Sequence, residues 1–472
     1  MIHFDSSTPS SPEDLSILAG TRPTPPFLIE PACGADLADY RRLRTAEFVR
    51  EQALFAGSDA DEIDDDPRTV VLVARGPDGT VLGGVRLAPV GAVDIGWWTG
   101  SRLVTTRAAR SSGVGPALIR AACAHVESAG VLRFEADVQT RYVRVFSDLN
   151  WKPLGEKMIA GRSHTRMRYP INPFVGLAAA TKSFLGDTLA PLRAIRGGLG
   201  PAGFVGDDGA PVPGTDVVAA CDAIIPSMVE RDPEWAGWCS VLVNINDLTA
   251  MGARPIGLLD AVGAPTRPIL DRVVRGITAA SAAWRVPVLG GHTQLGVPAA
   301  LAVTALGRTA DPVPAGGGRA GDRVRLTADL TGGWRPGYTG KQWDCTSARS
   351  ATDLAAMAGL VAELRPRAAK DVSMAGVVGT LGMLAEASGV GAELAVADIP
   401  RPAGASAGQW LTCFPGYAML TAGRTRRAPG LPPGVADADC GSLTATPGVR
   451  LRWPDGVTTT VLTASVTGIG PA

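Results

Sequence analysis

The chain has 472 residues, of which 46% are hydrophobic, and its 45 basic and 45 acidic side chains give a formal net charge of zero. This length predicts two or three domains, and the balanced charge argues against a general nucleic-acid-binding protein, which needs a basic excess or stripe. Seven scattered cysteines, without a CxxC or Cys/His cluster, favour neither a disulfide framework nor a zinc site.

Targeting signals are also missing from the sequence. The N-terminal stretch carries acids and prolines instead of the apolar core of a signal peptide, and no apolar run reaches the length of a membrane span. We therefore expect a cytoplasmic protein that acts on small molecules and has neither a nucleic acid nor a membrane as a partner.

Changes in composition divide the chain into segments. Residues 1–26 are rich in Ser, Pro and Thr and are predicted to be disordered. Mixed helix and strand patterns fill 27–170, 178–312 and 320–472, and stretches rich in proline or glycine, PINPFVG and PVPAGGGRAGD, separate them. The acidic stretch DADEIDDDP (59–67) indicates an exposed loop.

The first informative stretch is LVTTRAARSSGVGPALIRAACAHVESAG, residues 103–130. Leu103 and Val104 open a β-type run, and apolar residues at helical spacing predict a helix after the loop. Gly113 and Gly115 lie where the loop becomes that helix, and without a Cβ they let a ligand approach the backbone. Free amides and the positive end of the helix dipole favour an anion there, so the stretch predicts a pyrophosphate-binding loop.

This stretch resembles motif A of the GNAT N-acetyltransferases, because Arg110, Gly113 and Gly115 match its Arg/Gln-x-x-Gly-x-Gly/Ala signature. The resemblance covers residues 27–169 and implies a GNAT fold. It also implies that the loop binds the pyrophosphate of acetyl-CoA and that the strand of Leu103 and Val104 pairs with the pantetheine arm. Many members place a tyrosine general acid where this chain has Phe146, and a phenyl ring cannot donate a proton. Tyr142, one turn earlier, either takes that role or is a surface residue.

A second informative stretch is FVGDDGA (204–210), in which Asp207 and Asp208 are adjacent like charges. Asp222 lies in the apolar strand pattern VVAACDAIIP, and Asp247 lies in VLVNINDLTAMGARP. An acid in apolar surroundings is costly to bury unless it is paired or bound to a metal. The four carboxylates predict a magnesium site that also takes phosphate oxygens. Alternatively, each acid caps a helix, and Asp247 is well placed to do so.

The order of these acids, NDLTAMGARP, LGGHT (289–293) and KDVSMAGVVGTLGMLAEASGVGAEL (370–394) resembles the superfamily of aminoimidazole-ribonucleotide (AIR) synthase, thiamine-monophosphate kinase and selenophosphate synthase. The resemblance covers 178–472 and implies a two-domain, PurM-like α/β module that dimerises through its first, ATP-binding half. It further implies Mg·ATP binding by the aspartates at 207, 208, 222 and 247, nucleotide contacts from Asn246 and Thr293, and a catalytic segment with Asp371, Ser373 and Gly376.

Two departures from that superfamily bear on the chemistry. His292 replaces the acid of Gly-Gly-Asp/Glu-Thr, so fewer metal ions are expected, and its imidazole is a candidate acid/base catalyst or phosphate ligand. The segment DVSMAG lacks the second aspartate of the kinase's Asp-x-Ser-Asp-Gly, so chemistry identical to that of the thiamine enzyme is not expected.

Together these patterns predict a multidomain α/β and α+β protein. The resemblances imply a bifunctional enzyme, in which an acetyl-CoA-dependent N-acyltransferase is fused to a Mg·ATP-dependent module that phosphorylates or activates a small nitrogenous metabolite. Similar fusions are linked to nitrilase clusters of bacterial nitrogen assimilation. The alternative is an acetyltransferase whose second half is a non-catalytic ATP sensor or a dimerisation module.

Overall fold

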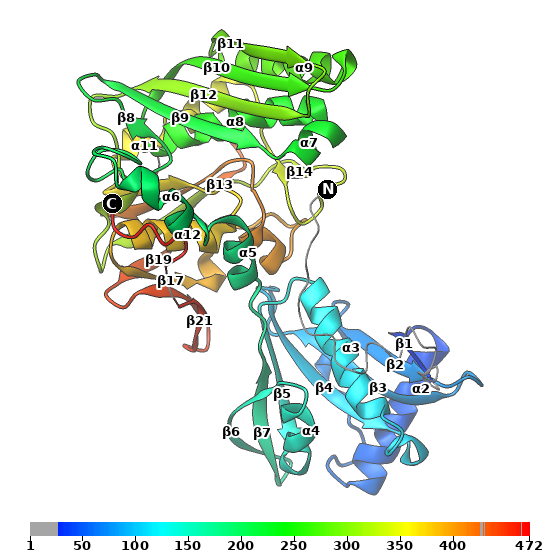
Figure 1. Ribbon diagram of the computed structural model, residues 1–472. Coiled ribbons are helices and arrows are strands. Elements are labelled where there is room, and N and C mark those ends of the chain that lie inside the picture. The colour runs from blue at the N-terminus through cyan, green and yellow to red at the C-terminus, as the bar shows by residue number, and fades with distance from the viewer. Residues whose placement is uncertain (1–26, 425–427, 429, 464) are drawn as a thin grey trace. The chain divides into compact units, whose positions relative to one another are not determined.

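A computed structural model describes residues 27–424, 428, 430–463 and 465–472 (Figure 1). The segment predicted to be disordered, 1–26, lies outside the described residues. The chain forms two compact units, Met1–Ile171 and Asn172–Ala472. The division between them falls within the PINPFVG stretch.

The first unit is built on a seven-stranded sheet with the order β1-β2-β3-β4-β5-β7-β6. Its strands are β1 (Leu28–Pro31), β2 (Val70–Arg75), β3 (Val81–Pro89), β4 (Trp97–Thr105), β5 (Arg133–Gln139), β6 (Lys152–Ile159) and β7 (Arg162–Tyr169). Its helices are α2 (Ala35–Arg44), which continues into the π-helix η1 (Thr45–Glu51), α3 (Val114–Ser128) and α4 (Val143–Ser147), and short 3-10 helices are η2 (Glu62–Asp65), η3 (Arg107–Ala109) and η4 (Thr140–Tyr142).

Both faces of this sheet are covered, as the sequence of β2 shows. Its run VVLVAR is apolar on both faces, a pattern typical of a strand buried on both sides. Leu72 and Ala74 pack in the core formed with α3, whereas Val71 and Val73 pack with Tyr40 of α2 on the opposite face.

The acidic stretch 59–67 is not the exposed loop that its composition indicated. Asp59 is buried, and Asp61 caps η2 with a capping box. Two fully buried arginines, Arg44 and Arg86, bind these acids: Arg44 contacts Asp59 at 2.6 Å and Asp64 at 2.5 Å, and Arg86 contacts Asp61 at 2.5 Å. Charges of this density are tolerated because arginines from α2 and β3 neutralise them.

The second unit contains two sheets. The first has the order β11-β10-β12-β9-β8. Its elements are α5 (Pro173–Thr181), α6 (Leu185–Arg193), β8 (Ala210–Pro211), β9 (Val217–Ile224), α7 (Pro226–Arg231), α8 (Pro233–Ala250), β10 (Arg254–Ala264), α9 (Arg267–Trp284), β11 (Val288–Leu295) and β12 (Ala300–Arg308).

Helices α8 and α9 pack against each other unusually closely. A Cβ on Gly237 of α8 would lie 2.2 Å from the carbonyl oxygen of Val273, and one on Gly276 of α9 would lie 2.0 Å from that of Glu234. Glycine at both positions therefore permits backbone contact between the helices.

The two faces of the first sheet differ. Val218, Ala220 and Val303 are buried in the core with α8. The opposite face, here called the outward face, carries Cys221, Leu259, Ala261, His292 and Thr304, which pair laterally across the strands. All residues of β11 are exposed.

The second sheet has the order β16-β18-β13-β19-β17-β20-β21. Its strands are β13 (Arg323–Asp329), β16 (Ala368–Asp371), β17 (Gly391–Ala395), β18 (Ala418–Gly423), β19 (Val435–Thr444), β20 (Gly448–Arg452) and β21 (Thr458–Leu462), and a two-stranded ribbon is formed by β14 (Gly333–Trp334) and β15 (Trp343–Asp344). The remaining elements are η5 (Ala315–Gly317), α10 (Ala351–Ala358), α11 (Leu360–Leu364), α12 (Gly376–Ala387), η6 (Val396–Asp398) and α13 (Ala407–Thr412). The almost wholly buried α12 packs on this sheet (Figure 1).

Candidate functional site

Three aspartates from separate parts of the second unit meet at one place. Asp208 lies in the loop before β8, Asp247 in the last turn of α8, and Asp371 at the end of β16. Helix α8 contacts β9 and β12 of the first sheet and β16 of the second. Packing of α8 against both sheets therefore brings the three acids together.

Their geometry suits a hard cation. One carboxylate oxygen from each of Asp208, Asp247 and Asp371 lies within 4.8 Å of the others. Asp208 Oδ2 is buried without a hydrogen-bond partner, and an orphaned buried carboxylate oxygen is costly unless a ligand completes it. Carboxylate oxygens are the ligands that Mg²⁺ prefers. The residues present thus fit a magnesium ion. The helix-cap alternative for Asp247 is wrong, because this residue lies inside α8 and not at its N-terminus.

The electrostatics show how much this group of acids needs a positive charge. Burial raises the pKa of Asp247 well above its ordinary value, and the charge of Asp371 raises it further. Burial likewise raises the pKa of Asp371, followed by the charge of Asp208. The charge of Asp222 contributes to both shifts. A divalent ion bound between these carboxyls would therefore offset both the cost of burial and their mutual repulsion.

Lys370, the residue before Asp371, supplies one positive charge. Its buried ammonium forms an ion pair with Asp208 Oδ1 and lies 3.7 Å from Asp207 Oδ1. Burial lowers the pKa of Lys370, but the carboxylates of Asp208 and Asp207 raise it by more, so the ammonium stays charged. The sequence analysis missed this residue, although a lysine within the buried strand AAKD is a signal of a buried ion pair.

Asp207 has a different role from its neighbour. Its Oδ1 accepts a hydrogen bond from the Asp208 amide at 2.8 Å, and its Oδ2 accepts one from the Ala315 amide at 2.7 Å. Burial raises its pKa to about 6, despite the opposing charge of Lys370. Both oxygens are thus engaged in fixing the loop against η5, and Asp207 is not among the three acids that converge.

Two other predicted ligands lie on the first sheet. Asp222 pairs with the buried Val303 on the helix-covered face. Its side chain is exposed to solvent on one side, and desolvation by the protein atoms around it raises its pKa. His292 pairs with Ala261 on the outward face. Because adjacent rows of a sheet point to opposite faces, the structure does not bring His292 to the acids.

The remaining predicted residues have structural roles or lie elsewhere. Asn246 is buried and donates a hydrogen bond to the carbonyl of Gly416 at 2.8 Å. Thr293 lies in the exposed strand β11. The amide of Ser373 donates to Thr380 Oγ1 at 3.4 Å, and Gly376 begins α12 with φ +66°.

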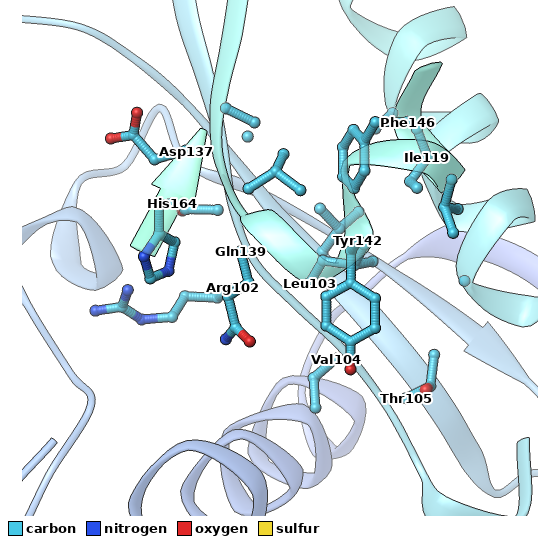
Figure 2. A pocket seen from close by; sticks show the side chains of 18 of the residues that line it. Arg102, Leu103, Val104, Thr105, Ile119, Asp137, Gln139, Tyr142, Phe146 and His164 are labelled. Carbon is cyan, nitrogen blue, oxygen red and sulfur yellow. The ribbon is translucent and has the colours of Figure 1, made fainter. Parts of the chain in front are cut away.

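The first unit contains a pocket of about 440 Å³ (Figure 2). Strands β4 and β5 pair in parallel only from Trp97↔Arg133 to Gly100↔Ala136, although both strands continue further. The pocket is lined by residues of both strands beyond this pairing, including Leu103 and Val104, and by Gly115 at the start of α3.

The glycine loop at this pocket leads into helix α3, at the position that the sequence predicted. Gly113 is the N-cap of α3 with φ +81°, a conformation that favours glycine, and a Cβ there would meet nothing within 4 Å. No side chain caps the helix. The side chain of Arg110, which also lines the pocket, is held by Glu51 at 2.9 Å and by Glu47 at 2.5 Å. The loop therefore offers backbone amides to a ligand, whereas the Arg110 guanidinium is already paired with Glu47 and Glu51.

Tyr142 and Phe146 occupy neighbouring positions in the pocket wall. Phe146 is buried and packs edge-on against Trp151, with ring centroids 5.2 Å apart. Tyr142 is 45% exposed and also lines the pocket, and Figure 2 shows its hydroxyl end beside Val104. His164 of β7 lines the pocket as well, and its Nδ1 is engaged with the Arg162 carbonyl at 3.0 Å.

Among the helices that the structure describes, none is both long and apolar enough to cross a membrane.

Comparison with known proteins finds relatives of the second unit. Residues 206–309 match the model of the AIR synthase related protein, N-terminal domain. Over 96 residues the chain is 33% identical to the thiamine-monophosphate kinase of Methanospirillum hungatei, which is 20% of this chain and 34% of that enzyme. The solved thiamine monophosphate kinase of Aquifex aeolicus aligns at 19% identity with a TM-score of 0.41, covering 54% of this chain and 92% of that one.

A longer match is found with the uncharacterized protein sll0787 of Synechocystis. The two sequences are 38% identical over 231 residues, which is 47% of this chain and 71% of that protein. This chain therefore belongs to the same family as sll0787, and its residues 206–309 match the AIR synthase related protein, N-terminal domain.

Proposed function

We propose that residues 172–472 bind Mg·ATP and use it to phosphorylate or activate a small, nitrogen-containing molecule. The observation that carries this proposal is the convergence of Asp208, Asp247 and Asp371 around the orphaned Asp208 Oδ2. The matched family domain and the similarity to thiamine-monophosphate kinases support ATP as the phosphate source.

In this proposal the three aspartates hold the ion, and Asp207 holds their loop in place. When bound, Mg²⁺ neutralises the charge of the nucleotide phosphates and of the transferring phosphoryl group. Lys370 keeps Asp208 oriented toward the site. Asp222, nearby on the first sheet, is available to contact the ion through water, which Mg²⁺ usually retains.

The test compares Asp371→Asn with a control acid in the full chain. Titration calorimetry with Mg·ATP should show affinity falling at least about tenfold in Asp371→Asn, because a charge-bearing ion ligand is lost. Asp311→Asn is the control, since this side chain is 80% exposed and should leave affinity unchanged. Equal affinity in wild type and Asp371→Asn would contradict the assignment of the site.

Measuring ATP hydrolysis distinguishes a catalytic module from one that only senses nucleotide. We expect ADP release with at least one member of a panel of amines and nitriles. Tight ATP binding without hydrolysis under any of these substrates would favour the alternative, in which the module senses nucleotide and regulates the first unit.

For the first unit we propose an acetyl-CoA-dependent N-acyltransferase. The supporting observation is the pocket between the diverging ends of β4 and β5, with the open N-terminus of α3 at Gly113. Main-chain groups at Leu103 and Val104 would pair with the pantetheine arm, and the free amides of the loop would bind the pyrophosphate. Tyr142 is the proposed general acid, because its hydroxyl reaches the pocket and Phe146 has none.

A bulky substitution at the loop tests this assignment. Gly113→Trp should abolish the thermal protection of the protein by CoA, because an indole would cover the loop amides. Gly79→Trp is the matched control, since Gly79 also has a positive φ and open space around it but does not line the pocket. The loop assignment is wrong if CoA protects Gly113→Trp as well as it protects the control.

We further propose that the protein is a homodimer formed through the outward face of the first sheet. The support for this is the exposure of Leu259 and of the whole of β11, because an open sheet edge and an apolar face are features that proteins usually cover.

A further inference from the structure

The ion pair between Lys370 and Asp208 bears on the number of metal ions that the acidic site takes. The Asp208 carboxylate has two oxygens in different situations. Its Oδ1 contacts the Lys370 ammonium, and its Oδ2 is buried with no partner. The side chain is 10% exposed, and that of Lys370 is 5% exposed. One oxygen is therefore satisfied by a permanent cation and the other is left for a second positive charge.

This arrangement is that of a carboxylate shared between two cations. In two-metal sites, paired ions lie about 3.5–4 Å apart and act together on the transferred group. Here one of the two oxygens of the Asp208 carboxylate is already taken by the covalently attached Lys370 ammonium. An ammonium and a divalent ion do not both fit against the same buried oxygen, because the like charges repel at contact distance.

The neighbouring residues point the same way. Asp207, which could otherwise supply a further ligand, has both oxygens occupied by the amides of Asp208 and Ala315. His292 lies on the outward face of the sheet and supplies no ligand to this site. Among the described residues, the group able to hold an ion consists of Asp208, Asp247 and Asp371 alone.

We propose that this module is a single-ion site in which Lys370 takes the place of a second divalent cation. The inference rests on the proposed metal site and adds the number of ions and the residue that sets it. The ammonium offsets part of the carboxylate charge, so the site keeps its form without metal. The three aspartates then bind one ion through the oxygens that Lys370 leaves free.

The experiment counts Mn²⁺ bound to the full, nucleotide-free chain by equilibrium dialysis and by electron paramagnetic resonance of free Mn²⁺. Wild type should bind one ion per chain. Lys370→Gln should bind two, because Asp208 Oδ1 becomes available and one positive charge is lost. Lys157→Gln is the control, since Lys157 also pairs with an aspartate, Asp137 at 3.0 Å, but lies in the other unit; its count should stay at one.

The results distinguish the number of ions from the existence of the metal site. Two or more ions in wild type overturn the single-ion inference, and so does a count of one in a folded Lys370→Gln. If Lys370→Gln fails to fold, the apolar variant Lys370→Met serves with the same expected count of two, and the wild-type count remains decisive. No binding to wild type at millimolar Mn²⁺ would contradict the metal site itself and hence the proposed function.

Discussion

At the scale of single residues, both units bury charged side chains and compensate them with partners distant in sequence. In the first unit Arg44 and Arg86, each 1% exposed, hold Asp59, Asp61 and Asp64. In the second unit Lys370 contacts Asp208, 162 residues earlier in the chain. Removing one member of such a set leaves an uncompensated buried charge, which costs more than the intact set contributes.

The compensation of buried acids by buried arginines can be tested at Asp64, because its contribution to stability depends on pH. Burial raises its pKa, but hydrogen bonds from Arg44 and Arg86 lower it by more, so the net pKa lies well below the ordinary value. The stabilisation is therefore fully present above the unfolded-state pKa of about 4 and is lost as pH falls toward the folded-state value.

We expect Asp64→Asn to destabilise the first unit by about 3 kcal/mol at pH 7, and the difference from wild type should shrink below pH 4. Hydrogen exchange of peptides from residues 27–171 measures this unit in the full chain. The adjacent Asp65→Asn is the control, because that residue is exposed and should behave as wild type. A pH-independent difference would argue against an ionic origin.

At the scale of elements, α8 determines the geometry of the acidic site. It packs on the first sheet, contacts β16 of the second, and carries Asp247 in its last turn. Its position depends on close contact with α9 through Gly237 and Gly276. A shift of α8 by the width of a methyl group would move Asp247 relative to Asp208 and Asp371.

A single methyl group tests this packing. Gly276→Ala should destabilise the second unit by about 1–3 kcal/mol, although alanine favours helix formation, because the new Cβ would lie 2.0 Å from the Glu234 carbonyl oxygen. In Gly176→Ala, in α5, the new Cβ meets nothing within 4 Å, so the same change should be neutral or stabilising by up to about 1 kcal/mol. Urea denaturation of both variants gives the comparison, and equal stability would show that the helices can separate freely.

At the scale of the whole molecule, each unit has its own hydrophobic core, and the second unit leaves the outward face of its first sheet uncovered. Leu259, 39% exposed, lies in the row that includes Thr304 and Cys221. We expect this face to pair with that of a second copy of the chain.

The association state tests this expectation. Light scattering after gel filtration should give twice the chain mass of 48.6 kDa for wild type and the single-chain mass for Leu259→Glu, because a carboxylate cannot be buried at the centre of an apolar interface without a partner. Leu28→Glu changes a leucine that is 70% exposed in the other unit and should remain dimeric. A monomeric wild type would contradict the proposed interface.

Local patterns in the sequence determined much of this description. Helical spacing of apolar residues predicted α3, the glycines of the loop marked its start, and the aspartates at 207, 208, 222 and 247 were recognised as candidates for a metal site, of which Asp208 and Asp247 meet. Asp371, the third acid there, was named only through the family resemblance. These features depend on residues within a few turns of one another, and periodicity and motif spacing report such short-range order.

Only the tertiary structure decided which of these residues meet. It brought Lys370 to Asp208, engaged Asp207 and Asn246 in backbone contacts, turned His292 to the outward face, and buried Asp59 of an acidic stretch expected to be exposed. Each outcome depends on the strand register or on helix packing between segments far apart in the chain. A shift of one residue in register reverses the face to which a side chain points, and no local pattern contains that information.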